Sequence, residues 1–169
     1  MSGRERSSDT GPFLVFDIGT GEVDERGGTF ALEVGHVFQV IEPGRVSPVP
    51  LAPAVVLGIL NHHGRIVTVV DPAPLLELPP QEGPVMQAVI LRQGLRGPAN
   101  LALKAARIHG IVVRGDLAEV DVEPRSCVAW AAQSGRRLIH VVALEPLLER
   151  LSRLFGSVDS RPTVQGVTV

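Results

Sequence analysis

The sequence predicts an all-β protein with short helices, folded as two small closed β-barrels in tandem. Three observations support this prediction. The apolar runs are short and rich in valine, isoleucine and leucine, glycine and proline separate them, and one pattern of residues occurs twice. The 169 residues are enough for one ordinary domain or for two small halves that share an interface.

Strands are expected wherever a short aliphatic run is bounded by turn residues. The segments that meet this condition are 13–18, 29–34, 36–42, 65–71, 85–92, 100–105, 107–113, 126–132 and 137–144. Two segments break the pattern. Residues 72–78 begin at prolines and predict a single helical turn, and residues 144–155 carry leucines at helical spacing and predict a helix.

The folded part is expected to span residues 13–155 as one domain with two subdomains, at about 13–80 and about 84–155. The polar residues 1–12 are expected to form a disordered tail, and residues 156–169 a second flexible tail, because neither shows a helical or strand period.

One pattern of the chain occurs twice. Residues 64–77, GRIVTVVDPAPLLE, resemble residues 135–150, GRRLIHVVALEPLLER, and a shift of 72 positions superposes seven identities within 13 positions. The seven are Arg65, Val69, Val70, Pro74, Leu75, Leu76 and Glu77. A shift of 71 lays 30–41 on 101–112 with apolar residues on apolar counterparts. Chance similarity predicts no common offset, so we infer a duplicated β unit of roughly 70 residues, a size that fits a small barrel.

Composition narrows the class of partner. Apolar residues make up 44% of the chain and aromatic residues 4%, so small aliphatic side chains must fill the core. A net charge of -2, from 16 basic and 18 acidic residues, provides no field that would attract nucleic acid. The apolar runs are far shorter than the roughly 18 residues of a membrane span. We expect a cytoplasmic protein that binds no nucleic acid and inserts into no membrane.

The stretch 37–71, VFQVIEPGRVSPVPLAPAVVLGILNHHGRIVTVVD, closely resembles the signature of the bacterial chemotaxis coupling protein CheW and of the regulatory domain of the kinase CheA. The most specific part runs from Pro48 to Asp71, and the resemblance covers nearly all of the expected folded part. It implies two SH3-like five-stranded barrels, no catalysis and no cofactor. It also implies an adaptor that joins the cytoplasmic tips of chemoreceptors to a CheA-type histidine kinase in two-component signalling.

The partner-binding surface is expected in a groove between the two barrels. The resemblance points to the strand at 37–41 and the turn at 58–65, and the apolar contacts there suit a helix hairpin of the receptor. The candidate contact residues are Val37, Gln39, Gly58, Asn61, His62, His63, Gly64 and Arg65. A bulky residue in place of Gly58 is expected to weaken receptor binding without unfolding the protein.

Two positions depart from the family pattern. The family usually carries Asn-Leu-Arg-Gly where this chain has Asn-His-His-Gly at 61–64, and a glutamate where it has Gln39. Both departures remove a permanent charge. A neutral hydrogen bond between Gln39 and His63 is therefore expected in place of an ion pair.

Other residues that suggest chemistry are interpreted as structural. His62 and His63 are adjacent in an extended segment, so their side chains are expected on opposite faces and no metal site is predicted. Residues 19–28 contain glycines but lack the ending of a phosphate-binding loop, and predict a hairpin loop. Cys127 is expected to be a buried thiol within a strand, and Trp130 to anchor the second barrel or its interface with the first.

Three functional classes follow from these features. A receptor-to-kinase adaptor is preferred, and a specialised scaffold for a different motility or signalling partner uses the same surfaces. A small-molecule sensor remains a further alternative, because the sequence contains no pocket signature for or against it. No enzyme motif is present.

Overall fold

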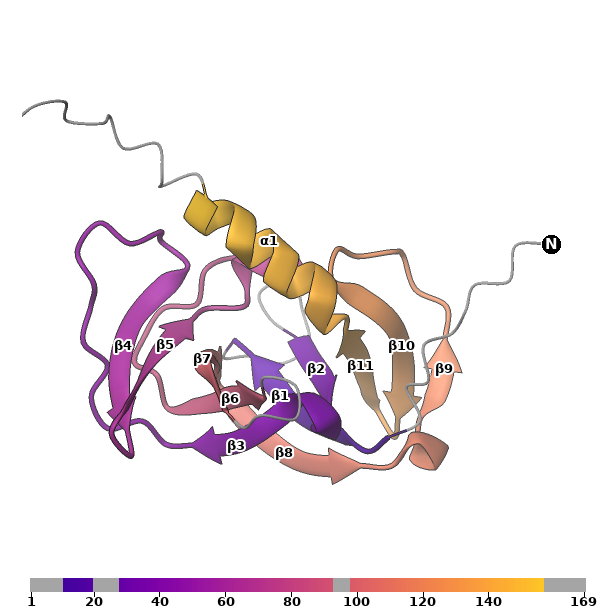
Figure 1. Ribbon diagram of the computed structural model, residues 1–169. Helices are drawn as coiled ribbons and strands as arrows, with labels where there is room; N and C mark the ends of the chain where they lie inside the picture. Colours follow the sequence, from indigo (N-terminus) through magenta and orange to yellow (C-terminus); the bar gives the residue numbers. More distant parts are fainter. Residues whose placement is uncertain (1–10, 20–27, 93–97, 157–169) are drawn as a thin grey trace, which may run out of the picture.

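The computed structural model describes residues 11–19, 28–92 and 98–156 (Figure 1). Most of the two expected tails, 1–12 and 156–169, and of the expected hairpin loop at 19–28 lies outside the described residues. No helix within the described ranges is long and apolar enough to cross a membrane.

The fold consists of two β-sheets and one C-terminal helix, α1 (Leu144–Gly156). In spatial order the first sheet contains β8 (Arg107–Val112), β1 (Phe13–Ile18), β2 (Gly28–Glu33), β11 (Arg137–Val142), β10 (Val128–Ser134) and β9 (Ala118–Val120). The second contains β3 (Val37–Ile41), β6 (Gln87–Arg92), β7 (Pro98–Ala105), β5 (Arg65–Val70) and β4 (Val56–His62). Short 3₁₀ turns lie at η1 (Val34–His36), η2 (Pro74–Leu76) and η3 (Arg114–Asp116). The predicted all-β class with a C-terminal helix is confirmed.

The sheets differ from the two closed five-stranded barrels that the sequence predicts. They have six and five strands, and the ladders of the described residues do not close, since β8 and β9 are the edges of one sheet and β3 and β4 of the other. The connector between β3 and β4 carries four prolines, which lack the N–H that a closing strand must donate. In place of a strand, it contributes an isolated β-bridge between Ser47 and Ile59.

Each sheet takes strands from both halves of the chain. Strands β1 and β2 join the late strands β8 to β11, while β6 and β7 join the early strands β3 to β5. The predicted boundary at residues 80–84 therefore does not separate one sheet from the other.

The repeat seen in the sequence recurs in the strand pairing. Strand β2 pairs in parallel with β11, with Ala31 opposite Val141, and β5 pairs in parallel with β7, with Val69 opposite Ala102. Adding 71 to Ala31 and 72 to Val69 converts the members of one pair into those of the other. The two sheets therefore share one pairing pattern. In each of them, a strand of the first half of the chain lies parallel to a strand of the second half.

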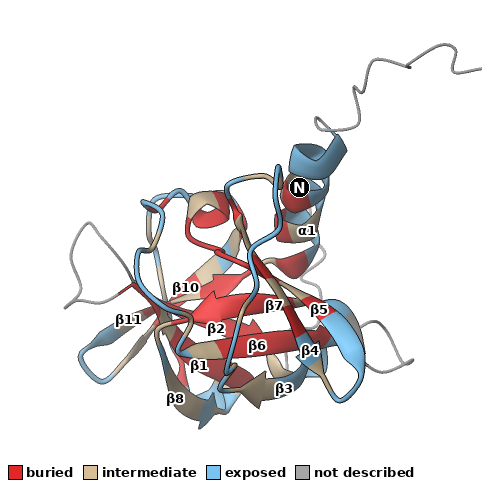
Figure 2. Cartoon of the chain, turned by 90° about the vertical axis from the view of Figure 1, so that its left-hand side faces the viewer, coloured by how far each residue is buried: buried red, intermediate tan, exposed pale blue. Residues whose placement is uncertain are grey.

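Three clusters of buried side chains hold the fold together, one within each sheet and one between the sheets. Strand β1 shows how they are divided, because Phe13 and Val15 face the cluster within the first sheet whereas Leu14 and Phe16 face the cluster between the sheets. Figure 2 shows the buried residues of these clusters in the centre of the molecule. Apolar side chains fill much of the seam between the sheets, and a docking groove along it stays a prediction.

Trp130 belongs to the cluster of the first sheet. Its ring meets Phe13 edge to face, with centroids 5.6 Å apart, and the guanidinium carbon of Arg114 lies 4.2 Å from the centre of the Trp130 ring. The predicted role as an anchor of the second half is confirmed, although the sheet that it anchors also contains β1 and β2.

Candidate partner-binding surface

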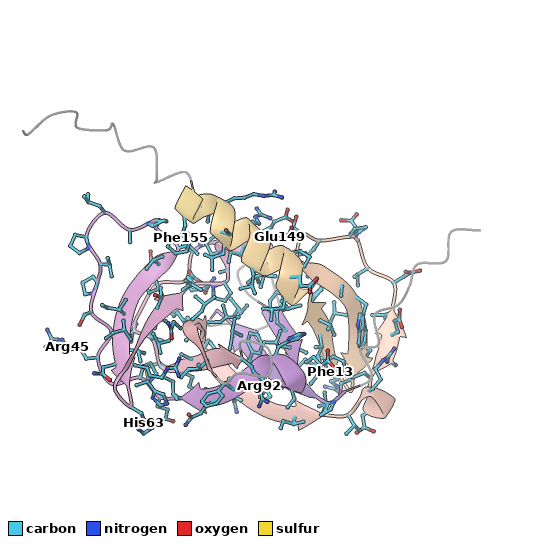
Figure 3. The ribbon with its side chains drawn as sticks, viewed as in Figure 1. Phe13, Arg45, His63, Arg92, Glu149 and Phe155 are labelled. Atoms are coloured by element: carbon cyan, nitrogen blue, oxygen red, sulfur yellow. The ribbon has the colours of Figure 1, made fainter. Side chains whose placement is uncertain are left out.

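A groove of about 890 Å³ lies between β3, β4 and the connector that joins them, at the open edge of the five-stranded sheet. Gln39, Val40 and Ile41 line it from β3, and Asn61 and His62 from β4. Arg45 lines it from the connector, and Figure 3 shows Arg45 and His63 on the same side of the molecule.

The hairpin beside this groove forms as the sequence predicts. The Asn61 side-chain oxygen accepts a hydrogen bond from the Gly64 backbone N–H at 2.8 Å. His63 and Gly64 both have positive φ, 50° and 80°, which is the backbone of the two-residue turn that matches the twist of paired strands. The predicted reversal between two strands is confirmed, and it presents His63 at an exposed tip.

Gln39 bonds to His62 rather than to His63. The Gln39 Oε1 atom lies 3.1 Å from His62 Nε2, so the expected pairing of Gln39 with His63 is wrong. The reason is local, because β4 continues to His62 and leaves His63 and Gly64 in the turn. The rings of His62 and His63 touch, with centroids 4.3 Å apart. Within the described ranges, no three His, Cys, Asp or Glu side chains gather where they could hold a metal ion.

The remaining candidates do not line the groove. Val37 is half-buried and packs against the cluster between the sheets. Arg65 is exposed at the start of β5, and its Nη2 atom donates to the side-chain oxygen of Asn100 at 3.4 Å. Of the eight predicted contact residues, the groove brings together Gln39, Asn61 and His62.

Gly58 is a buried structural residue. Its φ is 149°, and a Cβ placed on it would lie 2.3 Å from the backbone oxygen of Ser47. That close approach permits the two backbone hydrogen bonds, each 2.8 Å, between Ser47 and Ile59. A bulky residue at position 58 must displace this backbone, so we expect such a replacement to destabilise the fold as well as to change the surface.

Exposed apolar side chains on β3 and β8 were not among the predicted site residues. Phe38 on β3 is 40% exposed, and Ile111 on β8 is 63% exposed. Both strands run along the side of the molecule opposite α1 (Figures 1 and 2). We call this the edge-strand face and define it by Phe38, Gln39, Ile111 and Val113. The sequence did contain a signal for this face. Residues 37–41 and 107–113 carry aliphatic side chains at both inward and outward positions.

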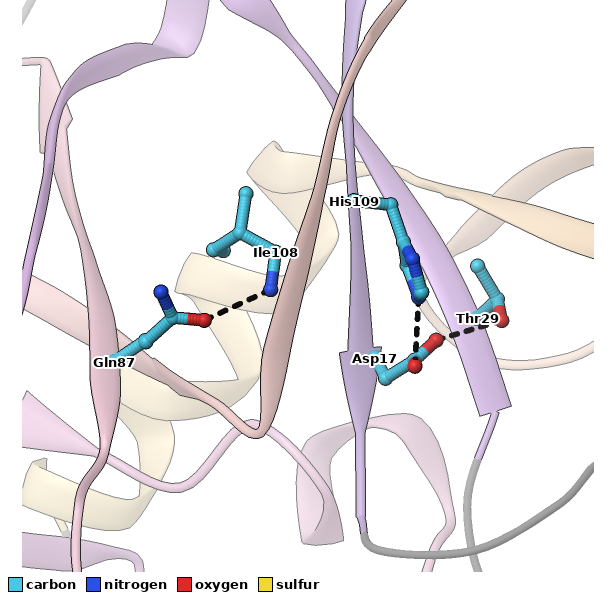
Figure 4. A network of polar contacts seen from close by, with 5 residues as sticks. All are labelled: Asp17, Thr29, Gln87, Ile108 and His109. Atoms are coloured by element: carbon cyan, nitrogen blue, oxygen red, sulfur yellow. Dashed lines mark hydrogen bonds and ion pairs between the residues drawn. The ribbon is translucent and has the colours of Figure 1, made fainter.

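A polar network holds β8 in place. His109 Nε2 on β8 lies 2.7 Å from Asp17 Oδ2 on β1, and the Thr29 hydroxyl donates to Asp17 Oδ1 at 2.8 Å (Figure 4). Beside it, the Ile108 backbone N–H donates to Gln87 Oε1 at 2.9 Å, which ties β8 to β6 of the other sheet. These contacts fix the position of half of the edge-strand face.

Cys127 is buried, as the sequence predicts, but it precedes β10 and has a φ of 62° instead of lying in a strand. Burial raises the pKa of its thiol, while the nearby Arg150 acts in the opposite direction. A thiol of raised pKa is protonated at neutral pH and is a poor nucleophile.

His140 on β11 is the titratable group whose burial predicts a pH effect. Its ring lies beside Phe30, with centroids 5.6 Å apart, and its buried Nδ1 atom has no hydrogen-bond partner among the described residues. Burial, and to a smaller extent the charge of Arg125, lower the pKa of His140 below its usual value near 6.5. The unfolded chain therefore takes up this proton at a higher pH than the folded protein.

We expect His140 to make the protein less stable as the pH falls below about 6.5, with a slope of at most about 1.4 kcal/mol per pH unit. The loss continues down to the lowered pKa of the folded state and is absent above pH 7. Urea unfolding of wild type and His140→Gln between pH 7.5 and 5.5 measures it, with the exposed His36→Gln as control. An equal pH dependence in wild type and His140→Gln would contradict the assignment.

Comparison with known proteins identifies the family. A model of the CheW-like domain matches residues 12–152. The chain belongs to the CheW-like domain family. This confirms the resemblance found in the stretch 37–71. The curated chemotaxis protein CheW of Thermotoga maritima is 31% identical over 77 residues, which are 46% of this chain and 50% of that protein. The match therefore spans about half the length of this curated CheW relative.

A solved CheW structure shows the same fold. The crystal structure of the scaffolding protein TtCheW from Thermoanaerobacter tengcongensis matches with a TM-score of 0.59 and 16% identity, over 79% of this chain and 88% of that chain. At this identity the likeness shows the CheW-like fold and nothing further about partners.

Proposed function

We propose that this CheW-like chain is a non-catalytic cytoplasmic adaptor that couples chemoreceptors to a CheA-type histidine kinase. The family and the names of its relatives, a chemotaxis protein and a scaffolding protein, support this proposal. The observation that carries it is the edge-strand face, where two edge strands from different sheets, β3 and β8, carry exposed large apolar side chains and run along the side of the molecule opposite α1 (Figure 1).

The edge-strand face has the chemistry that a receptor helix hairpin needs. An amphipathic helix binds through apolar anchors, and Phe38, Ile111 and Val113 provide aliphatic and aromatic contacts at 40%, 63% and 55% exposure. Gln39 adds a polar group on β3. The predicted contacts Val37, Asn61, His62, His63, Gly64 and Arg65 are not part of the edge-strand face. They stay proposed partner contacts beside it, on β3 and on the hairpin of β4 and β5, whereas Gly58 acts by shaping β4.

The alternative of a small-molecule sensor has less support. A second cavity, of about 450 Å³, contains the buried charges of Asp71 and Lys104. Lys104 Nζ already donates to the carbonyl oxygens of Gln81, Glu82 and Gly83 at 3.1–3.3 Å. Asp71 accepts the backbone N–H groups of Ala73 and Gln81. Both charged groups therefore fasten the connector between the two halves and have their hydrogen bonds supplied by the protein.

Replacing Phe38 by glutamate is expected to weaken binding to a chemoreceptor cytoplasmic-tip fragment by about tenfold or more, because it places a charge among apolar contacts. Leu154→Glu is the matched control, since Leu154 is equally exposed at 40% but lies on α1, on the opposite side. Titration calorimetry of both variants measures the difference. Equal affinities of Phe38→Glu and wild type would contradict the proposed receptor surface.

A further inference from the structure

The connector between β3 and β4 contains a tight turn at residues 49–52, which we call the Leu51 turn. The Ala52 backbone N–H donates to the Val49 carbonyl oxygen at 3.4 Å, and Leu51, which follows Pro50, has a φ of 61°. Proline at the second position and a positive φ at the third match a type II turn. The third position of such a turn favours glycine or asparagine, because other side chains are strained there.

Leucine at this position contributes nothing to the packing of the chain. Leu51 is 96% exposed, more than any other large apolar side chain in the described ranges, and it belongs to none of the three buried clusters. Asparagine or glycine would relieve the backbone strain and remove apolar surface from water. A side chain that is unfavourable in both respects for the isolated chain indicates a contact outside it.

The Leu51 turn is held between two fixed points of the backbone. Before the turn, two backbone hydrogen bonds of 2.8 Å join Ser47 to Ile59, and after it the Val56 N–H donates to the Pro53 carbonyl oxygen at 2.8 Å. Two more prolines lie between these points and restrict φ. A leucine on such a stiff turn loses little conformational freedom on binding, so Leu51 is preorganised for contact with a partner.

The surroundings of the Leu51 turn are uncharged. No aspartate, glutamate, lysine or arginine occurs from residue 46 to residue 61. Val49, within the turn, adds a second apolar side chain at 39% exposure. The matching site on a partner is an uncharged apolar pocket, because a charge buried against this turn would find no group to pair with.

The cavities of this chain do not match the Leu51 turn. Among the described residues, the cavities of about 890, 450 and 330 Å³ are lined by charged side chains that include Arg45, Lys104 and Arg150 respectively. A smaller one, of about 110 Å³, is lined by Arg137. A second copy of the chain would therefore bury the turn against charges, and the chemistry favours a different protein as the partner.

We propose that Leu51 anchors this chain in an uncharged apolar pocket of the kinase regulatory domain. The inference rests on the proposed adaptor function and names a contact for its second partner. The edge-strand face, assigned to the receptor, lies opposite α1, whereas the connector that carries the turn rises from the end of β3 to the α1 side of the molecule, where β4 begins (Figure 1). Two surfaces on different sides allow an adaptor to hold both partners at once.

Leu51→Asn is the variant that tests this contact. Asparagine keeps the left-handed turn and removes the aliphatic side chain, so the urea midpoint of the full chain is expected to stay the same or rise. The affinity for a purified regulatory-domain fragment of the CheA-type kinase from the same organism is expected to fall about fivefold or more in titration calorimetry. Leu51→Met keeps the apolar volume and is expected to bind within about twofold of wild type.

Met86→Asn is the matched control. Met86 is 63% exposed on the connector between β5 and β6, so this variant removes a comparable apolar side chain outside the Leu51 turn. Its affinity for the kinase fragment is expected to equal that of wild type. The two surfaces separate in the same assays, since Phe38→Glu weakens the receptor tip alone and Leu51→Asn weakens the kinase fragment alone.

Equal affinities of wild type and Leu51→Asn for the kinase fragment would overturn the inference and leave the adaptor function intact. An absence of binding between wild type and the kinase fragment would instead contradict the kinase half of the proposed function, and the inference with it. Self-association of wild type in sedimentation velocity that Leu51→Asn abolishes would make a second copy the occupant, and would also overturn the assignment.

Discussion

Gly58→Ala is expected to lower the free energy of unfolding by about 3 kcal/mol or more. The added Cβ would lie 2.3 Å from the Ser47 oxygen and 2.7 Å from the Ser47 carbonyl carbon, and both atoms belong to backbone that is hydrogen-bonded to Ile59. The φ of 149° also lies in a region that side-chain-bearing residues rarely adopt. Steric overlap and backbone strain therefore add together. Urea unfolding measured by circular dichroism gives the loss.

Gly44→Ala is the control for this substitution. A Cβ at Gly44 meets nothing within 4 Å, and its φ does not require glycine, so we expect a change within about 0.5 kcal/mol. Gly44 lies in the same connector that Gly58 contacts at Ser47, which makes the comparison local. Equal unfolding midpoints for Gly58→Ala and Gly44→Ala would contradict the structural role assigned to Gly58.

Leu147→Ala is expected to cost about 3 kcal/mol of stability. Leu147 is fully buried in the cluster between the sheets, on the face of α1 that covers this cluster. Alanine is a better helix former than leucine, so the loss must come from the removed packing and the cavity left behind. Its counterpart in the repeat, Leu75 in the turn η2, is buried in the same cluster. Each half of the chain therefore contributes an equivalent leucine to the cluster between the sheets.

Leu154→Ala tests whether packing or helix content causes that loss. Leu154 lies on the same helix but is 40% exposed, so its replacement is expected to cost less than about 1 kcal/mol. Thermal unfolding of the two variants gives the comparison. Similar losses at positions 147 and 154 would show that the helix does not seal the cluster as described.

Nine of the eleven strands in the described residues, all but β4 and β9, and the duplication were accessible from sequence because both are local or periodic. The offsets of 71 and 72 rest on residues such as Val69 and Val141, which later prove to occupy the same register in two parallel pairs. The partners of β1 were not accessible. Its residues are apolar on both faces, so the pattern states that both faces are buried but contains no information about which strands lie beside it.

The candidate surface was predictable to the extent that it depends on neighbouring residues. The turn at Asn61 and Gly64 follows from their spacing, and the structure contains it. The choice of His62 over His63 as the partner of Gln39 depends on where β4 ends, which the spacing does not determine. The role of Gly58 depends on a bridge to Ser47, eleven positions away across a proline-rich connector. Strand β9 was missed because it has three residues, two of them alanine and glutamate.

The exchange of strands between the halves has a consequence for synthesis on the ribosome. Strands β1 and β2 emerge first, yet their neighbours β8 and β11 are translated more than 70 residues later. At roughly 5–20 residues per second, the apolar strands at the N-terminus wait several seconds for the segments that shield them. In a nascent chain of this architecture, the first two strands therefore lack their final outer partners until nearly the last strand has left the exit tunnel.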